Sequence, residues 1–198
     1  MNDVITIVSV PHTGTHSVIE LFRNKGYNEI GLNKFAEGAI KLNETKINLV
    51  YGHMYEVNIQ TIKNLNKISQ IIVPIRDPLL SLISNYERRK PQNTDKKIAK
   101  TKKRQLLCWI LWANEIFKLN PFHVPVDLDV SHLKYGDVYF KNIGIYNTKG
   151  NYPLKQAYRN GDLFYIKSKL DLRDLVKMEY LLRPPLEQLG YKDLLWWK

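Results

Sequence analysis

The fold of this 198-residue chain is decided close to its N-terminus. The stretch reads Ile5-Thr6-Ile7-Val8-Ser9-Val10-Pro11-His12-Thr13-Gly14-Thr15-His16-Ser17, and the apolar residues Val18, Ile19, Leu21 and Phe22 follow it. The β-branched run predicts a buried strand, and the apolar spacing after Ser17 predicts a helix. A strand, a tight Gly-containing turn and a helix form an anion site, because the amides and the dipole at a helix N-terminus both favour negative charge.

Two interpretations of this turn remain open from the residues alone. The hydroxyls of Thr13, Thr15 and Ser17 offer side-chain donors to phosphate oxygens, which favours a phosphate-binding loop. A plain connection between a strand and a helix explains the same residues, because a single Gly is common there. The Gly-Lys-Ser/Thr ending of nucleoside-triphosphate loops is absent, and the turn contains no lysine, so a Mg-ATP hydrolase is disfavoured.

Composition indicates a globular protein. The length and the 44% hydrophobic content suit one α/β domain over residues 1–198. The chain has no run of 18 apolar residues and no basic-then-apolar leader, so we expect a soluble, cytoplasmic protein without membrane association. The lone cysteine, Cys108, lies in an apolar helical pattern, which predicts a core residue in a reducing compartment.

The net charge of +11 implies an anionic ligand or partner. Much of the excess falls within residues 88–104, where only Asp95 opposes a run of lysines and arginines. We expect a mobile basic loop there, which either attracts an anionic acceptor or carries incidental charge. The run has no interleaved aromatic residues and the chain has no nucleic-acid motif, which argues against a nucleic-acid partner.

Strands and helices alternate along the rest of the chain. Apolar runs predict strands at 27–32, 47–51, 71–75 and 122–126, and helical spacing predicts helices at 33–41, 57–65, from Pro78, and from about Ile98 to Pro121. We expect the last of these to turn inward Leu106, Leu107, Ile110, Leu111, Ala113 and Phe117. Residues 127–153 read as an irregular excursion, followed by helix from Leu154 toward Pro184-Pro185. This order predicts a parallel sheet flanked by helices on both faces.

Two motifs together resemble a known family. The first is Pro11-His12-Thr13-Gly14-Thr15-His16-Ser17, and the second is Ile75-Arg76-Asp77-Pro78-Leu79-Leu80-Ser81-Leu82-Ile83-Ser84. The pair resembles sulfotransferases that use 3′-phosphoadenosine 5′-phosphosulfate (PAPS), which have a P-loop nucleoside-triphosphate-hydrolase-like fold. Their 5′-phosphosulfate loop has a Pro-Lys-x-Gly-Thr-Thr character, and an Arg at a strand end and a Ser eight residues later hold the 3′-phosphate. Tyr51-Gly52-His53 is similar to a segment of the uronyl 2-O-sulfotransferase branch, whose His is the catalytic base.

The resemblance implies a function and a set of site residues. It implies in-line transfer of a sulfuryl group from PAPS to a hydroxyl or amine of a saccharide or small molecule, without a metal, leaving 3′-phosphoadenosine 5′-phosphate (PAP). His53 would be the base, with Glu56 and Glu20 as the fallback carboxylates. The implied cofactor-binding residues are His12, Thr13, Gly14, Thr15, His16, Ser17, Arg76, Ser84, Lys149 and Gly150, although Lys149-Gly150 reads equally well as a surface turn.

One departure from the family stands out. His12 replaces the loop lysine that neutralises the leaving phosphate, and imidazole is only partly charged near pH 7. Either His12 is protonated beside the anionic cofactor, or a lysine or arginine reaches in from elsewhere, or the protein binds nucleotide with little catalysis. A nucleotide kinase-like P-loop protein and a basic nucleic-acid-binding module remain the alternative functions.

Overall fold

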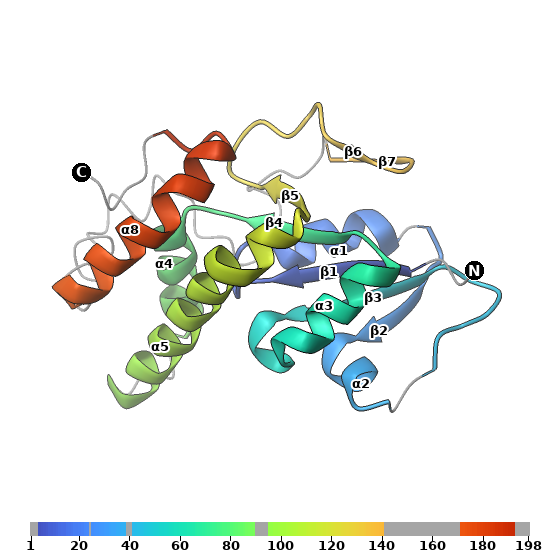
Figure 1. Cartoon of the computed structure of the whole chain (residues 1–198), viewed down its shortest axis with the longest axis horizontal. Helices are drawn as coiled ribbons and strands as arrows, with labels where there is room; N and C mark the ends of the chain where they lie inside the picture. Colours follow the sequence, from blue (N-terminus) through green and yellow to red (C-terminus); the bar gives the residue numbers. More distant parts are fainter. Residues whose placement is uncertain (1–3, 24, 39–40, 90–94, 141–170, 193–198) are drawn as a thin grey trace.

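A five-stranded parallel sheet forms the centre of the molecule. A computed structural model describes residues 4–23, 25–38, 41–89, 95–140 and 171–192. The strands follow the order β2-β3-β1-β4-β5 (Figure 1). They are β1 Val4–Ser9, β2 Asn28–Gly31, β3 Asn48–His53, β4 Ile71–Ile75 and β5 Phe122–Pro125. The predicted α/β class and the predicted parallel sheet are confirmed.

Helices connect the strands. They are α1 Thr15–Arg23, α2 Leu32–Ala36, α3 Ile59–Ile68, α4 Pro78–Arg89, α5 Asp95–Leu111 and α8 Leu172–Gln188. A 3-10 turn, η1 Met54–Glu56, precedes α3, and a π turn, η3 Trp112–Ile116, and a 3-10 turn, η4 Phe117–Leu119, extend α5. A short antiparallel hairpin of β6 Lys134–Tyr135 and β7 Val138–Tyr139 lies beyond β5. No described helix has the length and apolar character needed to cross a membrane.

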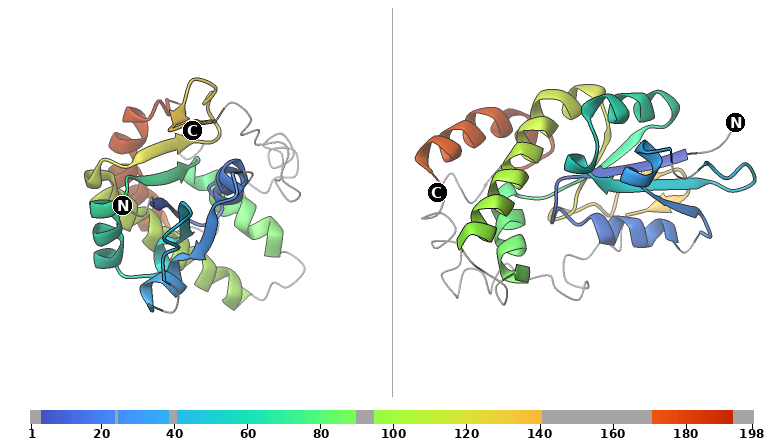
Figure 2. Two further views of the ribbon diagram at one scale, coloured as in Figure 1. Left: turned by 90° about the vertical axis from the view of Figure 1, so that its right-hand side faces the viewer. Right: turned by 90° about the horizontal axis from the view of Figure 1, so that it is seen from below.

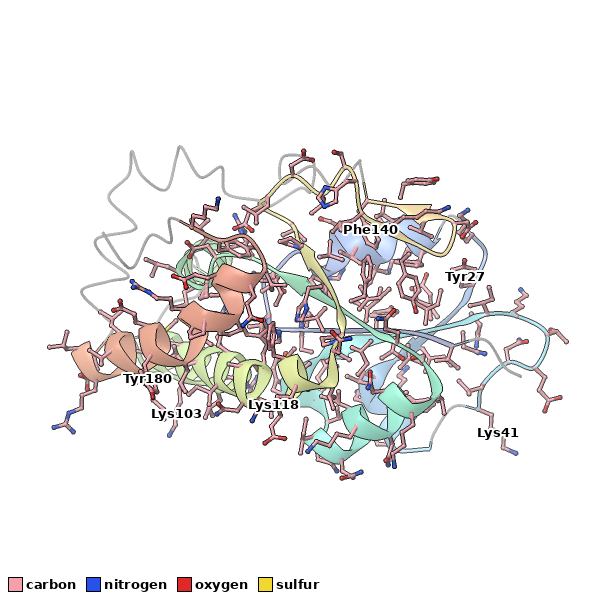
Figure 3. The ribbon with its side chains drawn as sticks, turned by 45° about the horizontal axis from the view of Figure 1, so that its top comes forward. Tyr27, Lys41, Lys103, Lys118, Phe140 and Tyr180 are labelled. Atoms are coloured by element: carbon pink, nitrogen blue, oxygen red, sulfur yellow. The ribbon has the colours of Figure 1, made fainter. Side chains whose placement is uncertain are left out.

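Each face of the sheet has its own apolar core. On one face, α1 and the segment around the hairpin pack against Ile7, Leu49 and Ile72. Phe140 lies over α1 there, with its ring centroid 6.4 Å from that of Phe22 (Figure 3). On the other face, α3, α5 and α8 cover Val8, Val50, Val73 and their neighbours. The right-hand view in Figure 2 shows α1 and α3 on opposite sides of the sheet.

The basic segment is helical, not a loop. Arg88 and Arg89 end α4, and residues 95–104 form the first turns of α5; only residues 90–94 of the predicted loop lie outside the described residues. Lys, Arg, Gln and Ala are good helix formers, so a charged run without apolar periodicity can still be helical. The prediction of a loop is therefore wrong for residues 88–89 and 95–104, and the helix predicted from about Ile98 begins slightly earlier, at Asp95.

Three further expectations are corrected. The helix predicted at 33–41 is the short α2, which begins at Leu32 after Gly31 and ends at Ala36. Leu107 is 57% exposed, and the buried face of α5 is formed by Leu106, Cys108 and Trp109. The last helix does not stop at Pro184-Pro185 but continues to Gln188.

The topology gives the sheet one edge suited to a ligand. β1 and β3 are neighbours, but the helices that follow them cover opposite faces, and ligands bind at such a switch point outside the carboxyl ends of the strands. The ladder between β1 and β4 reaches only the pair Ile7 and Ile72, so β1 and β4 are not paired at their carboxyl ends. Pro74, near the end of β4, has no N–H to extend it. The carboxyl ends point toward α4 and α5 (Figure 1).

Candidate functional site

The loop after β1 is held in a sharply bent conformation. His12 and Gly14 both have positive φ, 65° and 88°, while Thr13 between them does not. Alternation of this kind turns successive N–H groups toward one side, as in anion-binding backbone nests. Two features require glycine at position 14. Its φ is positive, and a Cβ there would lie 3.0 Å from Val126 Cγ2.

The hydroxyl of Thr13 is used inside the loop. It donates a 2.8 Å hydrogen bond to the carbonyl oxygen of Val10, and the residue is fully buried. Thr13 can therefore face an anion through its backbone N–H, while its side chain fixes the turn.

Gln105 of α5 ties the loop to the rest of the structure. Its Nε2 donates to the Pro11 carbonyl oxygen at 2.9 Å and to Ser81 Oγ of α4 at 2.8 Å. Trp109 Nε1 also lies 3.4 Å from Ser81 Oγ, and all three side chains are buried. Sequence reasoning missed this anchor, because a lone Gln in a charged stretch gives no local signal.

The N-terminus of α1 completes the loop. The Val18 N–H donates to the Gly14 carbonyl at 3.2 Å, so the amides of Thr15, His16 and Ser17 precede the first intrahelical bond. His16 is exposed and Ser17 is partly exposed, whereas Thr15 is buried and its hydroxyl donates to Ser9 Oγ at 2.7 Å.

Arg76 follows β4 at the same edge. It is 4% exposed, and its buried Nε has no hydrogen-bond partner among the described residues. Burial lowers the pKa of the guanidinium, and the nearby Asp127, Asp77 and Tyr191 oppose that shift. An orphaned buried guanidinium nitrogen is rare, because leaving such a donor unsatisfied is costly.

A carboxylate and a tyrosine support the segment that carries Arg76. Asp127, just after β5, accepts the Asp77 N–H at 2.8 Å and the Tyr191 hydroxyl. Burial raises the pKa of Asp127, and these two hydrogen bonds lower it. Sequence reasoning did not identify Asp127 or Tyr191, which lie 50 residues or more from this segment.

The start of α4 agrees with prediction. Asp77 Oδ1 accepts the N–H groups of Leu79 at 2.8 Å and Leu80 at 3.3 Å, which is the expected N-cap before Pro78. Ser84, two turns further along, is 7% exposed. Arg76 and Ser84 thus lie before and within one helix.

His53 ends β3 opposite Ser9 of β1. Its Nδ1 lies 2.9 Å from Ser9 Oγ, and its ring stacks on Tyr55 with centroids 5.5 Å apart. Arg104 of α5 is exposed, and its guanidinium carbon lies 4.7 Å from the centroid of the Tyr55 ring. The basic segment therefore reaches the surroundings of the candidate base.

The fallback carboxylates differ in their surroundings. Glu56 lies beside His53: burial raises its pKa, while a hydrogen bond with the His53 backbone lowers it. Glu20 is on the surface of α1 and pairs with Arg23, and no contact between described residues links it to the site.

The structure joins several predicted residues and leaves others apart. Thr15 and His53 are linked through Ser9, and the Gly14 loop packs on Val126 beside the Arg76 segment. Lys149 and Gly150 lie outside the described residues. Among the described residues, no cluster of three His, Cys, Asp or Glu side chains is arranged to hold a metal. A hollow of about 410 Å³ lies along α8, beside Val176, Tyr180 and Pro184, none of them a predicted site residue.

Comparisons with known proteins add little to this geometry. No family model and no curated protein matches the chain. Among solved structures, it is similar to the mouse sulfotransferase SULT7A1 complexed with PAP, at 20% sequence identity and a TM-score of 0.40. The match covers 64% of this chain and 53% of that one, so the chain spans about half the length of the sulfotransferase. A likeness of this extent assigns neither a family nor an activity to the chain.

Proposed function

We propose that this protein is a PAPS-dependent sulfotransferase, which transfers a sulfuryl group to an acceptor hydroxyl or amine. The observation that carries the proposal is Arg76 at the carboxyl edge of the sheet, a buried guanidinium whose Nε has no hydrogen-bond partner in the part of the chain that the structure describes. A phosphate oxygen at this position would satisfy the orphaned donor and offset the cost of the buried charge.

The donor set of the site fits a nucleotide with phosphates at two positions. The backbone amides of the Gly14 loop and the N-terminus of α1 suit a 5′-phosphosulfate. Arg76 and Ser84 suit a 3′-phosphate, since the planar fork of Arg matches phosphate oxygens bidentately. When bound, PAPS supplies both the sulfuryl group and its leaving phosphate, and no metal is needed for that chemistry.

The chain's own residues would bind, orient and move a proton. His53 takes the proton of the acceptor group, and its ring is held by Ser9 and by stacking on Tyr55. His12 lies in the loop with a positive φ. Its ring either donates a hydrogen bond to the leaving phosphate or, when protonated, places a positive charge beside it. Gly14, Thr15, His16 and Ser17 contribute backbone N–H groups, and Ser17 offers a hydroxyl as well.

The acceptor would enter beside Tyr55 and Arg104. Both side chains are exposed and lie on the side of His53 where α5 approaches. A cation and an aromatic face beside the base favour an anionic or saccharide acceptor, in keeping with the net charge of +11.

Binding of the product nucleotide tests the proposal directly. We expect PAP to bind with higher affinity than ATP or ADP in calorimetric titration of the wild-type protein. Arg76→Ala should weaken PAP binding by roughly 10- to 100-fold, because charge-assisted hydrogen bonds contribute about 1.5–3 kcal/mol. Arg23→Ala is the matched control: its guanidinium is committed to Glu20 and Glu29 at the far end of α1, so PAP affinity should not change.

The two rival functions predict different results. A nucleotide kinase-like protein would bind ATP as tightly as PAP or more tightly, with no special effect of Arg76. Absence of PAP binding by a folded wild-type protein would overturn the sulfotransferase proposal.

A further inference from the structure

Ser9 is a buried polar residue in a strand of otherwise apolar and β-branched side chains. It is fully buried at the end of β1, in register with His53 of β3. A buried hydroxyl has one hydrogen to donate and two lone pairs to fill, and buried polar atoms in native proteins are nearly always satisfied. The contacts of Ser9 Oγ show which groups form these three hydrogen bonds.

Three groups contact the Ser9 oxygen. The Thr15 hydroxyl donates to it at 2.7 Å. His53 Nδ1 lies at 2.9 Å, and the Gly52 carbonyl oxygen lies at 3.4 Å. Of these, the carbonyl can only accept, and the imidazole nitrogen either donates or accepts according to its tautomer.

Only one arrangement of hydrogens makes all three contacts hydrogen bonds. If Ser9 donates to His53 Nδ1, the Gly52 carbonyl receives nothing from it and one lone pair of the hydroxyl stays empty. If Ser9 donates to the Gly52 carbonyl, a hydrogen on His53 Nδ1 fills that lone pair, and the Ser9 hydroxyl is saturated.

We propose that Ser9 is a positioning residue that holds neutral His53 in the tautomer with its hydrogen on Nδ1. The lone pair of the ring then lies on Nε2, which is the form needed to take a proton at that atom. The tautomer is independent of any substrate; only its use to accept a proton from an acceptor group rests on the sulfotransferase function proposed above.

The same hydrogen-bond chain reaches the nucleotide loop. Its first donor, Thr15, is the first residue of α1, whose N-terminus forms the proposed phosphate site. The chain runs from Thr15 through Ser9 to the Gly52 carbonyl, so the loop and the candidate base contact one shared hydroxyl.

Nitrogen NMR of histidine-labelled protein tests this assignment without a ligand. At a pH where His53 is neutral, we expect its Nδ1 to carry the hydrogen in the wild type, with the signals assigned by their loss in His53→Gln. Ser9→Ala should shift His53 mainly to the Nε2–H form, which free histidine prefers in water. Ser9→Thr keeps the hydroxyl and should restore the Nδ1–H form, while Ser69→Ala, which removes a hydroxyl bonded to Thr6 of the same strand, should leave His53 as in the wild type.

Each result decides something. A wild-type His53 mainly in the Nε2–H form would overturn the proposal, even if no Ser9 variant folds. An Nδ1–H form that persists in a folded Ser9→Ala would show that Ser9 does not hold it. Failure of PAP binding with the Nδ1–H form intact would reject the sulfotransferase function and leave the role of Ser9 standing.

Discussion

His123 on β5 is a partly buried histidine whose aromatic surroundings favour the neutral ring. Its Nε2 accepts the indole N–H of Trp112 at 3.2 Å, and its ring packs against those of Trp112 and Phe117. Burial lowers its pKa from 6.5 to about 4. Below pH 6.5 the unfolded chain binds a proton that the folded protein does not, so stability is present above pH 6.5 and is lost as pH falls toward 4.

We predict that the free energy of unfolding falls by up to about 3 kcal/mol between neutral pH and pH 4 because of His123. Urea unfolding followed over this range measures the effect. His123→Gln keeps an acceptor for Trp112 and should flatten the dependence, whereas His132→Gln, at an exposed position, should leave it as in the wild type. Equal pH dependence in the wild type and His123→Gln would contradict the assignment.

At the scale of elements, α5 acts as a clamp on the β1–α1 loop through Gln105. Gln105→Leu removes the donor to Pro11 and Ser81 and should lower stability by about 1–3 kcal/mol, the usual cost of leaving buried acceptors unsatisfied. Hydrogen exchange of the amides of residues 10–14 should accelerate, and PAP affinity should fall with it. Leu107→Ala, on the exposed side of the same helix, is the control and should change neither. Unchanged loop exchange in a folded Gln105→Leu would show that the clamp does not order the loop.

At the scale of the whole molecule, the charge of +11 should govern how fast anions arrive rather than how one nucleotide is held. Lys103 and Lys118 are exposed on the outer side of the helical layer (Figure 3). We predict that the double change Lys103→Glu and Lys118→Glu slows PAP association and leaves its dissociation rate nearly unchanged.

The loss of affinity caused by Arg76→Ala should persist in high salt, because Arg76 is buried and its charge is poorly screened by ions.

Stopped-flow binding at low and high salt separates these effects. Binding of arbitrary duplex DNA that is tight in low salt, needs the lysines and is indifferent to Arg76 would favour the nucleic-acid module instead.

Much of the fold was predictable because its signals are local. The strands of a parallel sheet are buried on both faces and read as apolar runs, as at Ile71–Ile75, and Asp77-Pro78 marked the start of α4 to the residue. The start of α5 at Asp95 was placed a few residues late, and its basic first turns were also assigned to a loop, because their helix propensity comes from lysines with no apolar stripe. Leu107 was misplaced because the inward face of α5 is set by packing of Trp109 and Trp112.

The candidate site was only partly predictable. Arg76, His53 and the Gly14 loop follow strand ends and could be found from motifs, but their roles are still predictions. Gln105, Asp127 and Tyr191 entered through contacts between distant residues, which no local pattern encodes. Ser9 did leave a signal in the sequence. A hydroxyl in an otherwise apolar end of a buried strand indicates a buried hydrogen-bond partner.

The anchoring of the β1–α1 loop has a consequence for the order of folding. Pro11 and Gln105 are 94 residues apart, and the Tyr191 hydroxyl meets the Ile75 carbonyl across 116. Contacts of such long sequence separation form late, after the entropy of closing large loops has been overcome. We therefore predict that the loop, although synthesised before α5, acquires its fixed geometry only after α5 has docked. A nascent chain that has not yet extruded α5 should therefore contain β1 and α1 as sequence but not yet as a binding site.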